Sequence, residues 1–308
     1  MKLSTLIYDG MAMLNAPDLI ATDRKYSAWM YAGTHVGDFF EEIINDLYSL
    51  RLTRGASAVD GGAAWGVHTI PMSTLVGPDG RVFAIEALPD LAEKLARHLD
   101  DNGFHNVSVI PKAISNYVGN ARFTWVQGSP GYSGLQRREL PSGLETSVTE
   151  IDVPVATLGD ILANRQAPVR FIKLDLEGGE FHALQGAVDV LQKDRPLIVF
   201  EHSHHSAQGY GYAKDEWFDL FDCLHYEIFD LFGREFQRFD WHSSGRPWYL
   251  IAASAGSDDA AFIRTHYQSR IHDLFLRASP RIAVSALTHP GRVIGRLLRL
   301  CKRIPLTF

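Results

Sequence analysis

The sequence is poor in cysteine and in long apolar runs. Only Cys223 and Cys301 occur among 308 residues, which excludes a disulfide framework and a zinc site built from thiolates. No segment approaches the roughly 18 consecutive apolar residues that a membrane-spanning helix needs. The N-terminal sequence also lacks the basic start and apolar core of a secretion signal. We therefore expect a cytoplasmic protein of a reducing compartment.

Positive charge is also in short supply, because 30 Lys and Arg face 36 Asp and Glu, for a formal net charge of −6. This balance argues against a nucleic-acid-binding protein. The sign is unevenly distributed, since residues 260–308 hold nine Lys and Arg against Asp273 alone. That segment carries +8 and leaves −14 on the remainder, so the two parts should behave as separate electrostatic units.

Apolar runs alternate with helical patterns from residue 56 onward, which predicts a parallel sheet with right-handed crossovers. Two late runs should add an antiparallel pair that closes the sheet. Between the third and fourth strands an antiparallel hairpin replaces the usual helix, and its long loop, 127–146, is expected to form a lid that selects the acceptor. Expected strands are 56–60, 81–86, 107–110, 121–126, 147–155, 169–175, 197–201, 226–233 and 247–254, and expected helices are 66–76, 90–102, 179–192 and 213–224.

The first strand runs into a glycine-rich turn, GGAAWG (61–66), and then into a helix. Glycine at such a turn lets the backbone approach a ligand, and the amides of a helix N-terminus face it. The spacing does not match G-x-G-x-x-G, and no Gly-Lys-Ser/Thr follows, so dinucleotide and phosphate-loop patterns are both missing. The next strand ends at Glu86, where doubly wound folds bind ribose hydroxyls. An adenosine-type cofactor without a pyrophosphate, S-adenosylmethionine, fits this combination.

Several segments resemble, one after another, the FkbM-type methyltransferase family. They are VDGGAAWGVHT (59–69), FAIEALPD (83–90), AISNYVGNARFTW (113–125), VPVATLGDIL (153–162), FIKLDLEGGEFHALQGAVDVL (171–191) and PLIVFE (196–201). The turn departs from the usual family pattern at Gly62 and Ala64. The resemblance covers roughly residues 55–255 and implies the Rossmann-like class I α/β fold, a seven-stranded mostly parallel sheet with helices on both faces. It also implies O-methylation of a hydroxyl on a sugar, glycan, glycolipid or natural product.

The resemblance further implies which residues hold S-adenosylmethionine. The methionine part would lie against the turn after strand 56–60, and the ribose would lie against the end of strand 81–86. The adenine would lie just past strand 107–110, and the sulfonium beside the end of strand 169–175. The residues concerned are Asp60, Gly62, Gly66, Glu86, Ala113, Ile114 and Asp175. All of them lie at the carboxyl edge of a parallel sheet, which is the usual ligand crevice of open α/β folds.

A hydroxyl acceptor needs a group that takes its proton, and Glu201 and His202 follow a buried-type strand at this edge. They are the first choices for the base, with Asp175 as a further catalytic candidate. The segment EHSHH (201–205) also offers metal ligands, but alternation along it separates Glu201 from His202 and His204, so no metal site is predicted. The metal alternative and that of a solvated loop stay open. Glu177 and Glu180 could serve only to stabilise a helix N-terminus.

Substrate contacts are expected from polar and aromatic side chains in the loops, because aromatic faces often hold sugars. We assign this role to Tyr132, His204, Tyr210 and Tyr212 and expect Trp248 and Tyr249, inside a strand, to belong to the core. A non-catalytic cofactor-binding module and, less favoured, an NAD-dependent oxidoreductase are the alternative functions.

The chain divides into a helical N-terminal extension (1–54), a methyltransferase domain (55–255) and a basic helical C-terminal extension (256–308). Within the last, residues 292–304 predict an amphipathic helix with an arginine stripe opposite an apolar face. Such a helix suits peripheral contact with an anionic membrane, or docking onto the acidic body of the protein or onto a second subunit in a homo-oligomer.

Overall fold

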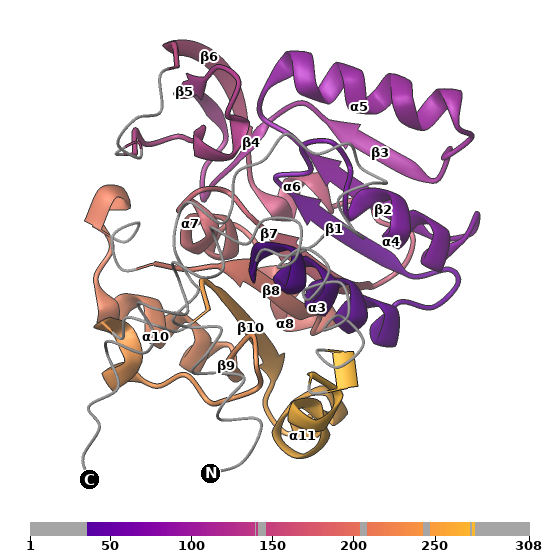
Figure 1. Cartoon of the computed structure of the whole chain (residues 1–308), viewed down its shortest axis with the longest axis vertical. Coiled ribbons are helices and arrows are strands. Elements are labelled where there is room, and N and C mark those ends of the chain that lie inside the picture. The colour runs from indigo at the N-terminus through magenta and orange to yellow at the C-terminus, as the bar shows by residue number, and fades with distance from the viewer. Residues whose placement is uncertain are drawn as a thin grey trace, which may run out of the picture.

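A seven-stranded sheet runs through the middle of the molecule (Figure 1). The computed structural model describes residues 36–138, 140, 146–203, 208–242, 247–271 and 273–274. The strand order is β3-β2-β1-β7-β8-β10-β9, and β10 runs antiparallel to both of its neighbours while the remaining pairs are parallel. The strands are β1 (Ser57–Gly61), β2 (Arg81–Ile85), β3 (Val107–Ile110), β7 (Val169–Leu174), β8 (Leu197–Glu201), β9 (Tyr226–Asp230) and β10 (Tyr249–Ser254). The predicted mostly parallel α/β fold is confirmed.

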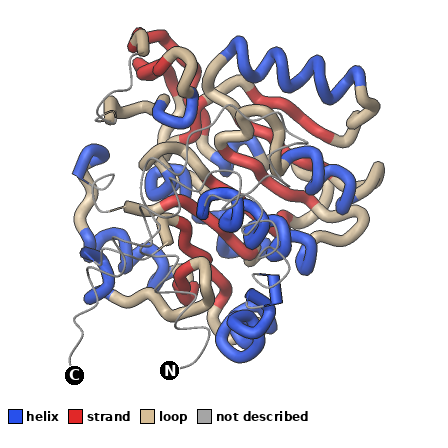
Figure 2. The backbone as a smooth tube through the Cα atoms, viewed as in Figure 1, coloured by secondary structure: helices blue, strands red, loops and turns tan. Residues whose placement is uncertain are grey.

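Helices cover both faces of this sheet (Figure 2). Successive residues of a strand point to opposite faces, and the two main apolar clusters take alternating positions of β8. Membership of these clusters therefore shows which helices cover which face. The first face is covered by α3 (Val36–Arg51), α4 (Thr69–Val76), α5 (Pro89–Asp101) and α11 (Asp258–Phe262). The second is covered by α6 (Leu158–Ile161), α7 (Glu180–Gln185), α8 (Val188–Asp194) and α10 (Lys214–Cys223).

A second, three-stranded sheet stands beside the carboxyl edge of the first (Figure 1). The predicted hairpin forms its larger part, as β5 (Gly119–Val126) pairs antiparallel with β6 (Val148–Ala156). The short β4 (Ala113–Ile114) pairs in parallel with β6, which the sequence pattern did not predict because two residues show no periodicity. The loop after β5 forms the 3-10 turn η2 (Pro130–Tyr132) and returns to bridge Thr124 with Gly134.

The expected helix over 179–192 is wrong in one respect, because the structure divides it into α7 and α8. The division falls at Gly186, where a Cβ atom would lie 2.4 Å from the carbonyl oxygen of Ser115. Its own carbonyl accepts a hydrogen bond from the amide of Gly159 at 2.9 Å. Contacts with distant parts of the chain therefore break a helix that the local pattern favours.

The segments flanking the expected 55–255 domain pack into its core. Phe40 and Tyr48 of α3, with Ile263 and Tyr267 of the π-helical turn η4 (Ile263–Tyr267), belong to the same apolar cluster as the strand residue Ile251. The 3-10 helix η3 (Arg238–His242) lies near α10. The tail helix predicted over 292–304 lies outside the described residues. Within the described part, no helix is both long and apolar enough to cross a membrane.

Candidate active site

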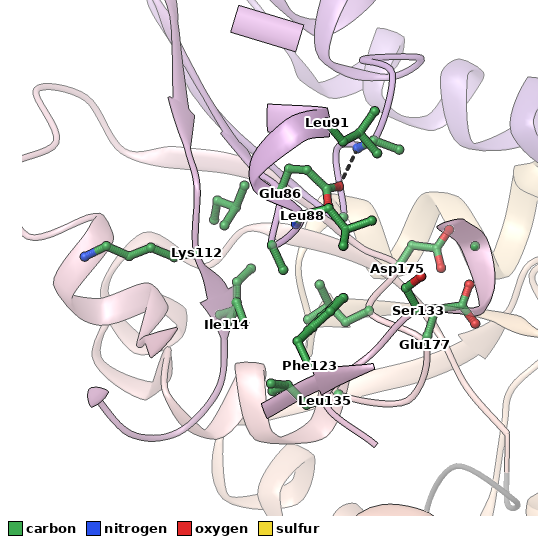
Figure 3. A pocket seen from close by; sticks show the side chains of 18 of the residues that line it. Glu86, Leu88, Leu91, Lys112, Ile114, Phe123, Ser133, Leu135, Asp175 and Glu177 are labelled. Atoms are coloured by element: carbon green, nitrogen blue, oxygen red, sulfur yellow. Dashed lines mark hydrogen bonds between the residues drawn. The ribbon is translucent and has the colours of Figure 1, made fainter. Parts of the chain in front are cut away.

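A recess that is partly open to solvent lies at the carboxyl ends of β1, β2 and β7 (Figure 3). The three-stranded sheet and the loop after β5 close it from the other side. Its described lining is Gly62, Ala64, Ile85, Glu86, Ala87, Leu88, Leu91, Lys112, Ala113, Ile114, Phe123, Gly131, Ser133, Leu135, Asp175, Leu176, Glu177, Gly179 and Tyr210.

The turn after β1 forms part of the wall and is held tightly in place. Gly62 has a φ of 74°, and a Cβ atom there would lie 2.0 Å from the carbonyl oxygen of Asp175. The amides of Gly62 and Ala63 donate to the carbonyl of Ile85 at 2.9 and 3.0 Å. Glycine is thus needed both for the left-handed backbone and for the close approach of the β1 turn to the end of β7.

Glu86, directly after β2, points into the recess with its carboxylate fixed by backbone amides. Ala64 donates to Oε2 and Leu88 to Oε1, each at 2.9 Å, and the residue is 7% exposed. Burial raises the pKa of Glu86 above its ordinary value, although the two amides oppose that rise. A carboxylate has about four acceptor positions, so two amides leave capacity for ribose hydroxyls.

The wall beyond Glu86 is apolar. Ala113 and Ile114 of β4 face it together with Leu91 of α5, Phe123 of β5 and Leu135 of the following loop. A flat, weakly polar ring such as adenine suits this surface, at the position where the family resemblance places it.

Asp175 follows β7 on the opposite side of the recess, and two buried groups hold its Oδ2 atom. The hydroxyl of Tyr249 donates to it at 2.7 Å, and the Lys173 Nζ lies 3.5 Å away. Lys173 is 4% exposed and lies 3.8 Å from Oδ1 of Asp60 on its other side. Burial lowers the pKa of Lys173, but the carboxylates of Asp175, Asp60 and Glu41 outweigh burial and raise it. Lys173 is therefore a buried cation between two strand ends.

Three carboxylates meet beside the recess, where Asp175 and Glu177 line it and Glu201 lies behind them. One oxygen from each of Asp175, Glu177 and Glu201 lies within 4.8 Å of the other two. We call this set the carboxylate group. Glu201 ends β8, and its Oε2 atom is buried without a hydrogen-bond partner. Burial, followed by the charges of Asp175 and Glu180, raises the pKa of Glu201 well above its ordinary value.

The segment after β7 supports this group. Glu177 adopts a left-handed φ of 56° and forms an ion pair with Arg138 from the loop after β5. Glu180 accepts hydrogen bonds from the amides of Leu176 at 2.6 Å and Gly178 at 3.3 Å, and burial raises its pKa to about 7. The predicted capping role of Glu180 thus extends to the whole turn that carries Glu177.

His202 does not lie with the carboxylate group. Its ring centroid lies 4.9 Å from that of Trp217 and 4.7 Å from that of Trp241, on the face of the sheet covered by α10. Adjacent residues of a strand point to opposite faces, so Glu201 and His202 cannot both serve the same site. Of the two expected bases, only Glu201 lies with Asp175 and Glu177, which line the recess.

Two residues expected around the cofactor lie behind the recess instead of lining it. Asp60 is 1% exposed and accepts a hydrogen bond from the Thr69 hydroxyl at 2.6 Å. Gly66 faces α5, where a Cβ atom would lie 2.6 Å from Leu95 Cδ1. The other five expected cofactor residues, Gly62, Glu86, Ala113, Ile114 and Asp175, line the recess together.

The expected substrate residues separate in the same way. Tyr210 lines the recess, whereas Tyr132 lines a neighbouring hollow beside Arg137. Tyr212 is buried in the core, with its ring centroid 4.5 Å from that of Phe181. His204 lies outside the described residues.

Sequence reasoning missed Lys173 and placed Tyr249 in the core without a polar role. Tyr249 is buried as expected, but its hydroxyl reaches Asp175. Lys173 carried a usable signal, since it is a charged residue inside the otherwise apolar end of a strand, VRFIKL. Buried charges are rare unless they are paired.

A doubly wound sheet with a single antiparallel strand next to its edge, and with a cofactor recess at the carboxyl ends of β1 and β2, defines the class I methyltransferase fold. The model of the methyltransferase FkbM domain matches residues 59–231, which is more than half of the chain. The protein therefore belongs to the FkbM methyltransferase family and uses S-adenosylmethionine as its methyl donor.

Curated relatives match over shorter stretches. A protein-L-isoaspartate O-methyltransferase of Ignicoccus hospitalis is 41% identical over 59 residues, which are 19% of this chain and 28% of the relative. One of Methanococcus maripaludis is 26% identical over 127 residues, 41% of this chain and 56% of the relative. The chain thus spans little more than half of these relatives at most.

Solved structures match this chain at low sequence identity and with low TM-scores. The FkbM methyltransferase of Methylobacillus flagellatus is 15% identical with a TM-score of 0.40, covering 81% of this chain and 58% of that one. The O-methyltransferase TomG of Streptomyces achromogenes is 14% identical with a TM-score of 0.42, and the match covers 83% of this chain and 91% of that one.

Proposed function

We propose that this protein transfers a methyl group from S-adenosylmethionine to a hydroxyl oxygen of a sugar, glycan, glycolipid or natural product. The observation that carries the proposal is the carboxylate group, of which Asp175 and Glu177 line the cofactor recess and Glu201 lies beside them. The cofactor supplies an electrophilic methyl group with a good leaving group. The protein has to align the acceptor, exclude water and accept the hydroxyl proton.

Glu201 is the best candidate for the proton acceptor. One oxygen of Asp175 is engaged by Tyr249 and Lys173, and Glu177 is paired with Arg138. Glu201 Oε2 has no such partner. A carboxyl group with a raised pKa is also a better match to a general base working near neutral pH.

The charge of the site favours a hydroxyl over a carboxylate acceptor. An isoaspartyl or other carboxylate substrate would place a fourth negative charge against Asp175, Glu177 and Glu201, and such like-charge contacts cost several kcal/mol. A neutral hydroxyl meets no such repulsion and can donate a hydrogen bond to Glu201. The short matches to isoaspartate methyltransferases therefore do not lead us to propose their substrate.

Labelled S-adenosylmethionine with glycolipid and small-molecule fractions of a cell extract tests this proposal. We expect a labelled product whose methyl group survives mild alkali, because a methyl ether is stable there while a methyl ester releases methanol. Glu201→Gln should lower the rate about 10²–10⁴-fold with little change in cofactor affinity. The exposed Glu150 of β6, changed to Gln, is the matched control. An alkali-labile product would contradict the proposal.

A further inference from the structure

The carboxylate group holds more negative charge than the described side chains around it neutralise. The described cations beside the three carboxylates are Arg138 and Lys173. Lys173 is also shared with Asp60. Three carboxylates that share two cations, one of them also facing Asp60, favour binding of a further positive charge.

Glu201 provides a second, separate indication. As a whole the residue is partly accessible, yet its Oε2 atom is buried, has no hydrogen-bond partner and belongs to the side chain that faces the other two carboxylates. Leaving a buried carboxylate oxygen without a partner is costly. A proton or a metal ion at this position would remove the cost.

The spacing of the oxygens fits a metal ion. Hard divalent cations bind oxygen ligands at about 2.0–2.6 Å, so any two ligands of one ion lie at most about 4–5 Å apart. The three oxygens here lie within 4.8 Å of one another. They come from the end of β7, the turn that follows it and the end of β8, so the sheet itself sets their separation.

We propose that Asp175, Glu177 and Glu201 bind a divalent cation of the Mg²⁺ or Mn²⁺ type at the edge of the recess. A ligand set made only of carboxylates favours such cations over Zn²⁺. This differs from a histidine-based site after β8, because the ring of His202 lies on the other face of the sheet.

The catalytic use of this ion rests on the proposed function. The ion would bind the acceptor hydroxyl and stabilise its oxygen as the O–H bond breaks. With Glu201 ligating the ion, the proton would pass to solvent instead of to Glu201. The oxygen then forms a bond to the methyl carbon while the carbon–sulfur bond breaks, which leaves neutral S-adenosylhomocysteine. The positive charge lost from sulfur is balanced by the released proton.

Arg138 is the internal competitor for the same position, because its guanidinium pairs with Glu177. An entering cation must displace this contact. Replacing Arg138 with Gln should therefore tighten cation binding, a change opposite in sign to that of the ligand variants. It would not be expected if the carboxylates had only a structural role.

Binding of the metal alone to the full chain tests the site without any acceptor. Titration of Mn²⁺, followed by the electron paramagnetic resonance of the free ion, should give one ion per chain, with Mg²⁺ competing. Glu201→Gln and Glu177→Gln should each weaken binding at least about tenfold, and Glu150→Gln should leave it unchanged. Circular dichroism checks folding, and Glu177, which is partly exposed, provides a variant that perturbs the core less than Glu201 does.

Absence of Mn²⁺ and Mg²⁺ binding at millimolar concentration, or undiminished binding in both variants, overturns the metal site. Methyl transfer assayed with and without EDTA separates this failure from that of the proposed function. An ether product formed equally well in EDTA, without metal binding, leaves the O-methyltransferase intact with Glu201 as base. Metal binding that depends on the carboxylate group, without any ether product, leaves the metal site intact and contradicts the proposed acceptor.

Discussion

The hydroxyl of Tyr249 donates a hydrogen bond to Asp175 at 2.7 Å, although the two residues lie 74 positions apart in the chain. Tyr249 is in β10 and Asp175 directly follows β7, so β8 lies between the two strands in the sheet. Burial and nearby carboxylates raise the pKa of Tyr249 well above its ordinary value, which keeps it a donor. The antiparallel strand therefore fixes the acid that lines the methyl-transfer site.

Tyr249→Phe should remove this positioning contact. We expect about a tenfold lower turnover, a change of no more than about twofold in cofactor affinity, and a loss of about 1–2 kcal/mol in the free energy of unfolding. Kinetics with calorimetric titration measures the first two, and urea unfolding the third. Tyr267→Phe is the control, since the Tyr267 hydroxyl is also buried but lacks a hydrogen-bond partner, and its loss should cost little.

Glu86→Gln should weaken S-adenosylmethionine binding about 10- to 100-fold by replacing charge-assisted hydrogen bonds to the ribose with neutral ones. Burial raises the pKa of Glu86, and its carboxylate form accepts ribose hydroxyls more strongly. Affinity should therefore rise with pH through this pKa in the unmodified protein and stay flat in the variant. Calorimetric titration across that range, with Glu93→Gln on the exposed side of α5 as the control, checks it. A pH dependence that survives in Glu86→Gln would place its origin elsewhere.

Glu180→Gln should change how stability depends on pH. The pKa of Glu180 is raised from 4.5 to about 7 in the folded protein, so the folded state binds a proton more tightly than the unfolded state does. Its contribution is therefore fully present below about pH 4.5 and is lost as pH rises to about 7, by no more than about 3 kcal/mol. Urea unfolding at several pH values should show a smaller loss in the variant. An equal loss in both proteins contradicts this assignment.

Gly62→Ala should destabilise the fold by about 3 kcal/mol or more, because a left-handed backbone and a 2.0 Å contact with the Asp175 carbonyl act together. Gly103→Ala separates these two causes. Gly103 has a similar φ of 76°, but no atom lies within 4 Å of the added Cβ, so only the backbone cost of about 1 kcal/mol applies. Urea unfolding of both variants gives the difference, and equal losses would contradict the proposed contact.

The arginine-rich tail is tested by removing the residues after Pro290. If residues 292–304 form the amphipathic helix that their pattern predicts, the full chain should sediment with anionic vesicles at low salt and dissociate at high salt. The shortened chain should not sediment. Failure of the full chain to bind vesicles favours docking onto protein, which a change in oligomeric state on truncation would reveal.

The sequence was enough to predict that residues at the ends of several strands meet, because the carboxyl ends of parallel strands lie at one edge of the sheet. That geometry alone brings Gly62, Glu86 and Asp175 to one recess. The alternation of Glu201 and His202 was also readable, but not which of the two faces the recess. That choice depends on the partners across β8, namely Trp217 on one side and the carboxylate group on the other.

Contacts between remote segments were beyond local patterns. The end of α7 at Gly186 follows from its contact with the Ser115 carbonyl, about 70 residues away in the chain, which no window of 11 to 18 residues contains. The same limitation hid the pairing of Arg138 with Glu177. Charged residues in apolar strands, such as Lys173, are the one signal that could have been used more fully.

The place of β10 between β8 and β9 has a consequence for synthesis of the chain. The family match ends at residue 231, yet among the described strands β9 joins the sheet through β10, which begins at Tyr249. A nascent chain released up to residue 231 would hold β9 with no strand to join and β8 with an open edge. The sheet can close only after residue 254 has left the ribosome, so this edge is the part of the fold most in need of protection from association during translation.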